Sequence, residues 1–336
     1  MILAAITTCR RAPDMVERAV KSVIAQTYKD WELVVIDDSP SDYELREDVR
    51  KMVEGYAAQD SRIRYVAHDN NYGSQRARNT ALKIAENTYE GGGPEFIAYL
   101  DDDDEWLPEK LEKQIARFAE CGDHTGMVYC NFYYADEDLP KLKYSAHFAG
   151  MGTEGKVFSK LIEGNFIAMV TLIRTKFLTE IGGFDETMPA LQDWEAWLRL
   201  SLRYDVAYIN EPLVVVYKDE GSDHIGGSYS RIIKAFEKVE DKYKDYLAEH
   251  PYTRWRLNNI TLPLYMLNGE YRKFFSSWQE MFCLQPQNKA DSISALFTAL
   301  YTVIRAKMKA MLFIVSPSVF YALKNRKHRQ KGDSIN

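Results

Sequence analysis

The sequence predicts an α/β fold with a mostly parallel mixed sheet flanked by helices, followed by an all-helical C-terminal region. Short apolar runs alternate with segments of helical periodicity, and several of these runs end abruptly in acidic residues. Such alternation is typical of β-α-β units, whose strands lie parallel. Near residue 228 the pattern changes, and only helical periodicity remains. We therefore expect two domains, over 1–228 and 229–336.

Two apolar runs near the N-terminus define the start of the sheet. Ile2 to Ile6 reads as a buried strand, and Pro13 can open the helix that follows it. Glu32 to Ile36 reads as the second strand and ends in Asp37 and Asp38. Ligands of such sheets bind beyond the carboxyl ends of the strands. We therefore expect these aspartates on one rim with the later acidic run.

The remaining elements follow from the same periodicity and from their turn residues. We expect helices over 42–57, 74–85, 108–120 and 174–180. Further strands are expected over 63–66, 127–133, 167–173, 206–209 and 213–217. Residues 135–155 are polar and read as a loop over the site. In the C-terminal region we expect helices over 229–249, 252–267, 271–282 and 290–314.

The acidic run after Phe96 to Leu100 is the strongest chemical signal in the chain. It places four aspartates, Asp101 to Asp104, directly after a predicted buried strand. Their repulsion must be offset by a cation, by shared protons or by water, and Mg²⁺ or Mn²⁺ suits carboxylate oxygens best. In extended backbone Asp101 and Asp103 share one face while Asp102 points away. The alternatives are a solvated acidic loop or an acidic start to the next helix.

Arg76 and Arg78 stand in the first turns of a helix that Ser74 can cap. Basic residues there work against the helix dipole, so their presence makes more physical sense if an anion binds beside them. The alternative is a pair of ordinary surface arginines. The loop Gly91 to Pro94 is not a phosphate-binding P-loop, because no Lys-Ser or Lys-Thr pair follows it.

Composition limits the function classes. The net charge of −6 argues against a general nucleic-acid binder, and 46% apolar residues is typical of a packed globular chain. The four cysteines form no C-x-x-C pair, which fits free thiols in a reducing compartment. The first residues carry no basic leader and read as a strand rather than a signal peptide. We expect a cytoplasmic location.

The C-terminal end has an uneven charge distribution. Residues 301–331 contain eight Lys and Arg and no acidic residue. The apolar runs Met311 to Val315 and Val319 to Leu323 are interrupted by Ser316-Pro317-Ser318 and are too short for a membrane span. We expect an interfacial amphipathic helix that attaches peripherally to an anionic membrane surface. The alternative is a packed C-terminal helix with a basic tail.

Five motifs taken in chain order resemble family 2 glycosyltransferases of the GT-A fold. They read T-T-C-R-R, V-V-I-D-D-S, G-S-Q-R-A-R-N, Y-L-D-D-D-D-E-W and G-G-F-D-E followed by Q-D-W-E-A-W-L-R-L. The resemblance covers about residues 1–217 and implies a Rossmann-like sheet. It also implies an inverting, nucleotide-sugar-dependent sugar transfer assisted by Mn²⁺ or Mg²⁺.

The resemblance implies roles for particular residues. The donor nucleotide sugar would bind among Thr7, Thr8, Arg11, Asp37, Asp38, Gln75, Arg76, Arg78, Asp101 and Asp102. Asp101 and Asp103 match the family's D-x-D metal motif, with Asp103 as the direct ligand. Asp193 matches the catalytic base, although Gln192 stands where a glutamate is common. His224 lies in a polar stretch, where it can reach the metal or diphosphate or simply be an exposed loop histidine.

Three functions remain open at this point. The first is transfer of a single sugar, with UDP as the favoured nucleotide, to a glycan or lipid-linked acceptor in cell-surface polysaccharide or glycolipid synthesis. The Q-x-x-R-W signature of processive members is absent, which favours single additions. The second is a sugar nucleotidyltransferase, which would want a Gly-rich loop where Thr7 to Pro13 holds no glycine. The third is a non-catalytic nucleotide-sugar-binding protein. The oligomeric state stays open.

Overall fold

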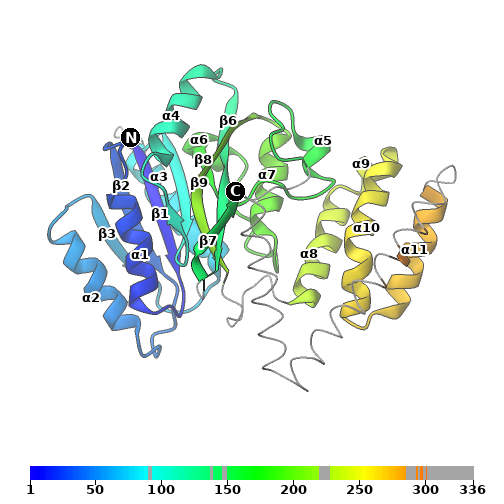
Figure 1. The fold of residues 1–336 in the computed structure, drawn as a ribbon, viewed down its shortest axis with the longest axis horizontal. Helices are drawn as coiled ribbons and strands as arrows, with labels where there is room; N and C mark the ends of the chain where they lie inside the picture. Colours follow the sequence, from blue (N-terminus) through cyan, green and yellow to red (C-terminus); the bar gives the residue numbers. More distant parts are fainter. Residues whose placement is uncertain are drawn as a thin grey trace. The chain divides into compact units, whose positions relative to one another are not determined.

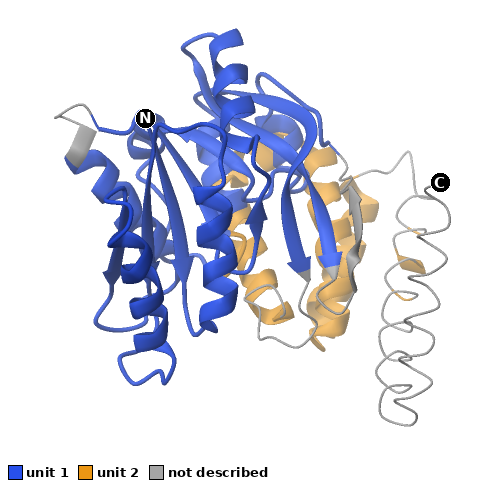
Figure 2. Cartoon of the chain, turned by 60° about the vertical axis from the view of Figure 1, so that its left-hand side comes forward, with its two compact units in different colours: residues 1–188, 192–221 blue, residues 189–191, 222–336 orange. Residues whose placement is uncertain are grey.

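The computed structural model describes residues 1–89, 93–136, 139–145, 150–218 and 228–284, together with 293, 296, 297 and 300. The chain divides into two compact units (Figure 2). The first contains residues 1–188 and 192–221, and the second contains 189–191 and 222–336.

The first unit is built on a mixed sheet of nine strands among the described residues (Figure 1). The strand order is β3-β2-β1-β4-β8-β6-β9-β5, and β7 pairs with β6. The neighbours from β3 to β4 are parallel, as are β6 and β9, whereas β8, β5 and β7 run antiparallel to their neighbours. The strands are β1 Ile2–Thr8, β2 Trp31–Asp37, β3 Ile63–Ala67, β4 Phe96–Asp101, β5 Glu105–Trp106, β6 Thr125–Asp136, β7 Leu139–Ser145, β8 Thr171–Arg174 and β9 Asp205–Lys218.

Helices flank this sheet (Figure 1), which confirms the predicted fold class. In α1, Pro13 occupies the first turn, and Val16, Ala19, Val20 and Val23 are buried, as their helical spacing predicts. The helices of the first unit are α1 Pro13–Ile24, α2 Arg46–Ala57, α3 Ser74–Tyr89, α4 Lys110–Glu120, α5 Phe158–Leu161, α6 Thr175–Glu180 and α7 Gln192–Ser201.

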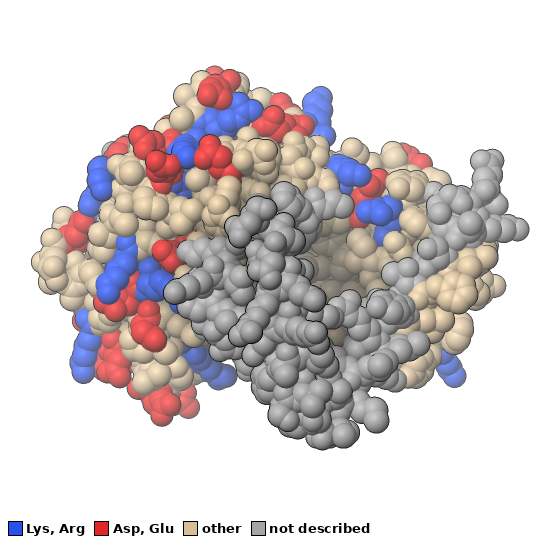
Figure 3. All heavy atoms as spheres, viewed as in Figure 1, with Lys and Arg blue, Asp and Glu red and all other residues tan. Residues whose placement is uncertain are grey.

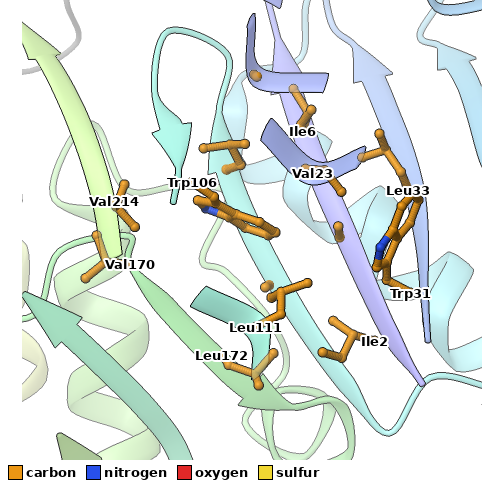
Figure 4. Packing of buried hydrophobic residues seen from close by; sticks show 14 of the residues in the cluster. Ile2, Ile6, Val23, Trp31, Leu33, Trp106, Leu111, Val170, Leu172 and Val214 are labelled. Carbon is orange, nitrogen blue, oxygen red and sulfur yellow. The ribbon is translucent and has the colours of Figure 1, made fainter. Parts of the chain in front are cut away.

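A buried tryptophan secures the end of the acidic run. Trp106 follows the acidic residues in β5, and its ring lies in the core with Val23, Leu111 and Val214 (Figure 4). The backbone N–H of Trp106 donates to the Ser22 hydroxyl at 3.1 Å. Full burial of such a ring contributes about 3–5 kcal/mol, judged by what its truncation costs. The chain after the acidic residues is thereby held close to the sheet.

Some boundaries differ from the predictions. β9 is one strand instead of two, because a register shift accommodates the break that Asn210, Glu211 and Pro212 would otherwise cause. Residues 135–155 are not simply a loop, since β6 extends to Asp136 and β7 pairs with it. An edge strand needs only backbone pairing on one side, so its polar composition does not exclude it. β8 begins only at Thr171, and β5 was not predicted.

The described C-terminal part of the second unit, residues 228–284, is built from helices, as predicted. Its helices are α8 Tyr229–Lys242, α9 Lys244–Glu249, α10 Pro251–Leu267 and α11 Tyr271–Leu284. Their core contains Ile233, Trp255, Leu262, Tyr265, Phe274 and Met281. Within the part of the chain that the structure describes, no helix is long and apolar enough to cross a membrane. His224, most of the predicted helix 290–314 and the basic segment 301–331 lie outside the described residues.

Candidate active site

Strand register brings four predicted site residues together in two neighbouring pairs. Thr8 pairs with Asp37 across β1 and β2, and Thr7 pairs with Asp101 across β1 and β4. All three strands are parallel and end at the same edge of the sheet. Polar residues that are distant in the sequence therefore converge on one rim, as the rule for parallel sheets predicts.

The acidic run forms a turn immediately after β4. The strand ends at Asp101, and the backbone N–H of Asp104 donates to the Asp101 carbonyl at 3.1 Å. Arg11 lies in the loop between β1 and α1. It donates from Nε to Asp102 Oδ1 at 3.0 Å and from Nη2 to Asp103 Oδ2 at 2.6 Å. The prediction that Asp102 points away from Asp103 is therefore wrong, because alternation requires extended backbone and that backbone ends at Asp101.

Burial and neighbouring carboxylates disfavour the ionised form of two aspartates in this turn. Burial raises the pKa of the Asp102 carboxyl to about 7, an effect that Arg11 opposes and Asp103 reinforces. Burial and the charges of Asp103 and Asp101 also raise the pKa of Asp104 well above its usual value. Carboxyl groups resist ionisation in this way when they are buried away from water and lie beside like charges. A cation bound at this turn would favour their ionised form.

The loop after β1 is fixed against the acidic turn. The backbone N–H of Cys9 donates to Asp102 at 3.3 Å, and that of Arg10 donates to the Ser39 hydroxyl at 2.8 Å. Arg10 has a φ of 55°, which non-glycine residues seldom adopt. Backbone strain of this kind persists where neighbouring contacts hold it in place.

Arg78 and Arg76 diverge on α3. Arg78 is buried and donates from Nη2 to Asp101 Oδ1 at 2.7 Å, while its Nε and Nη1 have no hydrogen-bond partner in the described structure. Arg76 is exposed, and its guanidinium lies 4.5 Å from the centre of the Tyr72 ring. Side chains two positions apart on a helix point about 200° apart, so only one of these two arginines can face the acidic turn. The structure brings Arg78 to that turn.

The two aspartates after β2 support the loop that precedes α3. The Asp38 carboxylate accepts bonds from the backbone N–H groups of Tyr72 and Gly73, at 2.9 and 2.7 Å, and contacts His68 Nδ1 at 2.7 Å. Asp37 accepts from the Tyr65 hydroxyl at 2.7 Å. Both aspartates are buried on the predicted rim, where protein groups already occupy most of their acceptor positions.

Gln75 and Asn79 connect α3 to the segment before α7. Gln75 is buried and donates from Nε2 to the Met188 carbonyl at 2.6 Å. Asn79 accepts from the Phe184 N–H at 2.9 Å and donates to the Phe184 carbonyl at 2.9 Å. Gln75 is therefore held by a protein carbonyl, although the sequence suggested it for the donor.

Asp193 and Glu195 have different environments in the first turn of α7. Asp193 is partly buried and accepts a 3.3 Å bond from Asn165 Nδ2. Burial raises the pKa of Asp193, while the Trp194 N–H and the charge of Arg78 lower it. Glu195 is fully buried and forms a two-bond ion pair with Arg199, at 2.8 and 2.7 Å. Glu195 is thus committed to a structural contact, and Asp193 is not.

With this geometry in view, comparison with known proteins identifies the family. Residues 4–182, more than half of the chain, match the family described as glycosyl transferase family 2. The chain belongs to this family. A relative from Escherichia coli K12, described as the putative colanic acid biosynthesis glycosyl transferase WcaA, is 27% identical over 241 residues, which cover 67% of this chain and 77% of that protein.

A second relative of this glycosyltransferase also comes from Escherichia coli. It is described as the UDP-Glc:alpha-D-GlcNAc-diphosphoundecaprenol beta-1,3-glucosyltransferase WfgD and is 28% identical over 209 residues, covering 62% of this chain and 73% of that protein.

Two solved structures share the fold of this glycosyltransferase at low sequence identity. S. aureus TarS in complex with UDP-GlcNAc has a TM-score of 0.58 at 16% identity, covering 84% of this chain and 81% of that chain. The mannosyltransferase PcManGT from Pyrobaculum calidifontis, in complex with GDP-Man and Mn²⁺, has a TM-score of 0.52 at 15% identity, covering 96% and 83%. These likenesses support the GT-A fold.

The carboxylates of this family 2 glycosyltransferase suit a hard divalent cation. Asp101 and Asp103 offer only oxygen ligands, which Mg²⁺ and Mn²⁺ prefer. Among the described residues, no group of three His, Cys, Asp or Glu side chains is arranged to hold a metal. Mg²⁺ commonly binds through one or two carboxylates plus substrate phosphates, without a protein cage. The donor set therefore fits, and His224 lies outside the described residues.

Several residues of this glycosyltransferase site were missed in the sequence. Arg18 donates to the Asp103 carbonyl at 2.5 Å and lies 3.9 Å from the centre of the Tyr217 ring. Tyr217 donates from its backbone N–H to Asp104 at 3.1 Å and from its hydroxyl to Glu105 at 3.0 Å. No local pattern marks Arg18 in mid-helix or Asn165 in a loop. His68 could have been found, because it directly follows β3 at the same rim.

Proposed function

We propose that this protein transfers a single sugar from a UDP-sugar to an acceptor hydroxyl, with inversion and with the help of Mn²⁺ or Mg²⁺. The observation that carries the proposal is the bond from Arg78 to Asp101 at the carboxyl end of β4, beside the acidic turn. Arg78 bonds to Asp101 and acts on the pKa of Asp193, on which the charge of Asp101 also acts. An inverting transfer needs positive charge at the leaving group and a base on the opposite side of the sugar.

The donor would lie along the rim formed by β1, β2 and β4. We assign its nucleotide to the neighbourhood of Thr7, Thr8, Arg11, Asp37 and Asp38, and its diphosphate to that of Arg78 and the acidic turn. The Nε and Nη1 groups of Arg78 have no hydrogen-bond partner among the described residues, and they support this assignment because each is a charged N–H donor that a phosphate oxygen can accept from. Arg76 faces away, and we leave it out of this set.

Asp101 and Asp103 would hold the cation, with His224 as a further candidate ligand. When bound there, the cation would neutralise charge that develops on the departing diphosphate. The ion pairs of Arg11 to Asp102 and Asp103 would keep the acidic turn in one conformation.

Asp193 would act as the general base. It would accept the proton of the acceptor hydroxyl while that oxygen forms a bond to the anomeric carbon. The bond from this carbon to the diphosphate oxygen would break on the opposite face, and its electron pair would leave with the UDP. A carboxyl whose pKa is raised by burial is a stronger base than an exposed one. Asn165 would orient it.

The relatives support the choice of substrates. WfgD is named for a UDP-sugar and a diphosphoundecaprenol acceptor, and the TarS structure holds UDP-GlcNAc. We therefore propose a lipid-linked glycan acceptor, and a peripheral location at the cytoplasmic face of the membrane with attachment through residues 301–331. We assign catalysis to residues 1–228. The sugar-nucleotidyltransferase alternative is disfavoured because the loop after β1 contains no glycine.

Donor assays test the function. Purified protein is incubated with a panel of UDP-sugars and undecaprenyl-diphosphate-linked saccharides, with Mn²⁺, with Mg²⁺ or with EDTA, and UDP release and product are measured. We expect UDP release and a glycosylated product only with a divalent cation. Release of pyrophosphate would indicate a nucleotidyltransferase, and donor binding without turnover would indicate a binding protein. Full activity in EDTA would contradict the role of the metal.

A further inference from the structure

Helix α11 carries an aromatic stripe, which we define as Tyr271, Phe275, Trp278 and Phe282. These residues stand at positions i, i+4, i+7 and i+11 of the helix. At about 100° of rotation per residue, their side chains fall within an arc of about 60°. The stripe therefore runs along one side of the helix for most of its length.

Part of this stripe is exposed and does not pack in the core of the second unit. Phe274 and Met281 are buried, whereas Tyr271 is 52% exposed and Phe275 is 59% exposed. Trp278 packs at the edge of the core, and its ring meets that of Phe282 edge-on at 5.1 Å. Large apolar side chains that lie exposed in a row mark a contact surface more often than isolated ones do.

Exposed apolar residues also occur after α11 in the sequence. Ile293 and Phe297 are helical residues one turn apart, and they are 43% and 65% exposed. The chain then runs into residues 301–331, which contain eight Lys and Arg and no acidic residue. Exposed aromatic residues followed by basic ones are the combination that binds at the surface of an anionic bilayer.

Charge distinguishes between two occupants of the stripe. A second copy of the chain would add a second acid-free basic segment to the assembly, and like charges repel. An anionic lipid surface would instead attract each segment through its basic residues. On the face of the first unit that Figure 3 shows, acidic and basic side chains are interspersed, so that face offers no comparable concentration of one sign.

We propose that the aromatic stripe of α11 is a contact surface for an anionic lipid bilayer. Tyr271 and Phe275 enter the headgroup region, and the basic residues after position 300 add electrostatic attraction. This extends the membrane contact from the basic segment to a folded helix of the second unit. Membrane contact through α11 does not depend on sugar transfer, so either can fail without the other.

Vesicle flotation tests this surface with the full-length protein. Vesicles of phosphatidylcholine alone or with phosphatidylglycerol are compared at low and at high salt. The test variant is Tyr271→Ser with Phe275→Ser, and the matched control is Tyr252→Ser, which removes a tyrosine of the same unit that is 51% exposed but lies on α10. Thermal unfolding of all variants checks the fold, and Phe275→Asn alone serves as a milder variant.

We expect the wild type to float with the anionic vesicles. Salt screens the basic segment but not the stripe, so at high salt the double variant should lose about tenfold in partitioning and Tyr252→Ser should lose almost none. Four results would overturn the proposal. These are no flotation of the wild type, equal partitioning of the double variant, an equal loss in Tyr252→Ser, and a wild-type dimer that the double variant converts to a monomer.

The other candidate for covering the aromatic stripe is the chain's own C-terminal segment. If residues 301–336 covered the stripe, their deletion would increase vesicle binding at high salt and the binding of a hydrophobic dye. That result would also contradict a lipid contact in the full-length protein. We expect the deletion to weaken binding at low salt and to leave the binding that resists high salt.

Discussion

The Arg78 guanidinium donates to the Asp101 carboxylate at 2.7 Å and keeps two further N–H groups without a partner in the described structure. Buried donors without acceptors cost free energy, so such an arrangement is unfavourable until an acceptor arrives. Phosphate oxygens carry negative charge and can accept from these N–H groups. The contact with Asp101 fixes the guanidinium beside the acidic turn, where we place the diphosphate.

Arg78→Lys keeps the charge but removes the paired N–H donors. We expect kcat/KM for the UDP-sugar to fall by about 10²-fold, because one ammonium cannot replace the guanidinium contacts. Arg76→Lys is the control two positions away, and it should change kcat/KM less than twofold. Steady-state kinetics with saturating Mn²⁺ distinguish the two. A larger effect of Arg76→Lys would mean that the wrong arginine has been assigned to the donor.

Asp103→Asn removes the charge of the proposed metal ligand and retains its size. The concentration of Mn²⁺ needed for half-maximal donor binding should rise by at least about tenfold, since an amide is a weaker ligand for a hard cation than a carboxylate. Calorimetric titration of UDP at several Mn²⁺ concentrations measures this. Glu105→Gln is the control, because Glu105 bonds to the Tyr217 hydroxyl instead. An unchanged Mn²⁺ requirement in Asp103→Asn would remove Asp103 from the metal site.

Asp193→Asn and Glu195→Gln should fail in different ways. Asp193→Asn removes the base, so sugar transfer should fall by roughly 10² to 10⁴ while donor affinity stays within a few-fold. Glu195→Gln leaves Arg199 without its charge partner, which should lower the free energy of unfolding by about 2–4 kcal/mol. Transfer assays and chemical denaturation measure the two effects separately. An inactive but fully stable Glu195→Gln would make Glu195 the base.

The raised pKa of Asp193 predicts the acid side of the pH profile. Burial raises this pKa, and a base must be ionised to accept a proton. As the pH is lowered, kcat/KM should therefore begin to fall at a pH higher than the ordinary aspartate pKa of about 4. A rate that is constant down to pH 4 would contradict the assignment.

The same shift has a consequence for stability. A carboxyl with a raised pKa in the folded state favours folding below its unfolded pKa, and this contribution is lost as pH rises through the folded pKa. At neutral pH the ionised Asp193 therefore destabilises the fold, and Asp193→Asn should be at least as stable as the wild type. Denaturant titration at pH 7 checks the sign. A clear loss of stability in this variant would mean that interactions with the ionised carboxylate outweigh the cost of its burial.

Gly183→Ala and Gly182→Ala form a matched pair at the turn before α7. Both glycines have positive φ, 69° and 82°, so alanine is strained at either position. At Gly183 an added Cβ would also lie 2.6 Å from Asn79 Oδ1, whereas at Gly182 it meets nothing within 4 Å. We expect Gly182→Ala to cost about 1 kcal/mol and Gly183→Ala about 1–3 kcal/mol more. Equal losses would show that the contact with Asn79 adjusts freely.

The sequence alone was sufficient for the fold class and for the rim on which Thr7, Asp37 and Asp101 meet. Apolar runs that end in Asp37 and Asp101 required parallel strands with acidic carboxyl ends, since period and burial are local properties of the chain. The order of the motifs predicted the family, and the family match confirms it. Asp193 at the start of α7 followed from the same order, although its role as the base is still to be tested.

Only the tertiary structure decided which side chains meet. The divergence of Arg76 and Arg78 depends on which face of α3 packs on the sheet, and the local sequence does not specify that face. The contact of Arg11 with both Asp102 and Asp103 depends on a turn that replaces extended backbone at Asp101. Contacts between residues about 90 or more positions apart, as between Arg11 and Asp102 or Tyr217 and Asp104, form when sheet register brings their strands together. The register of each strand depends on how its buried face packs against the rest of the protein. A short stretch of sequence therefore does not specify which distant residues it will meet.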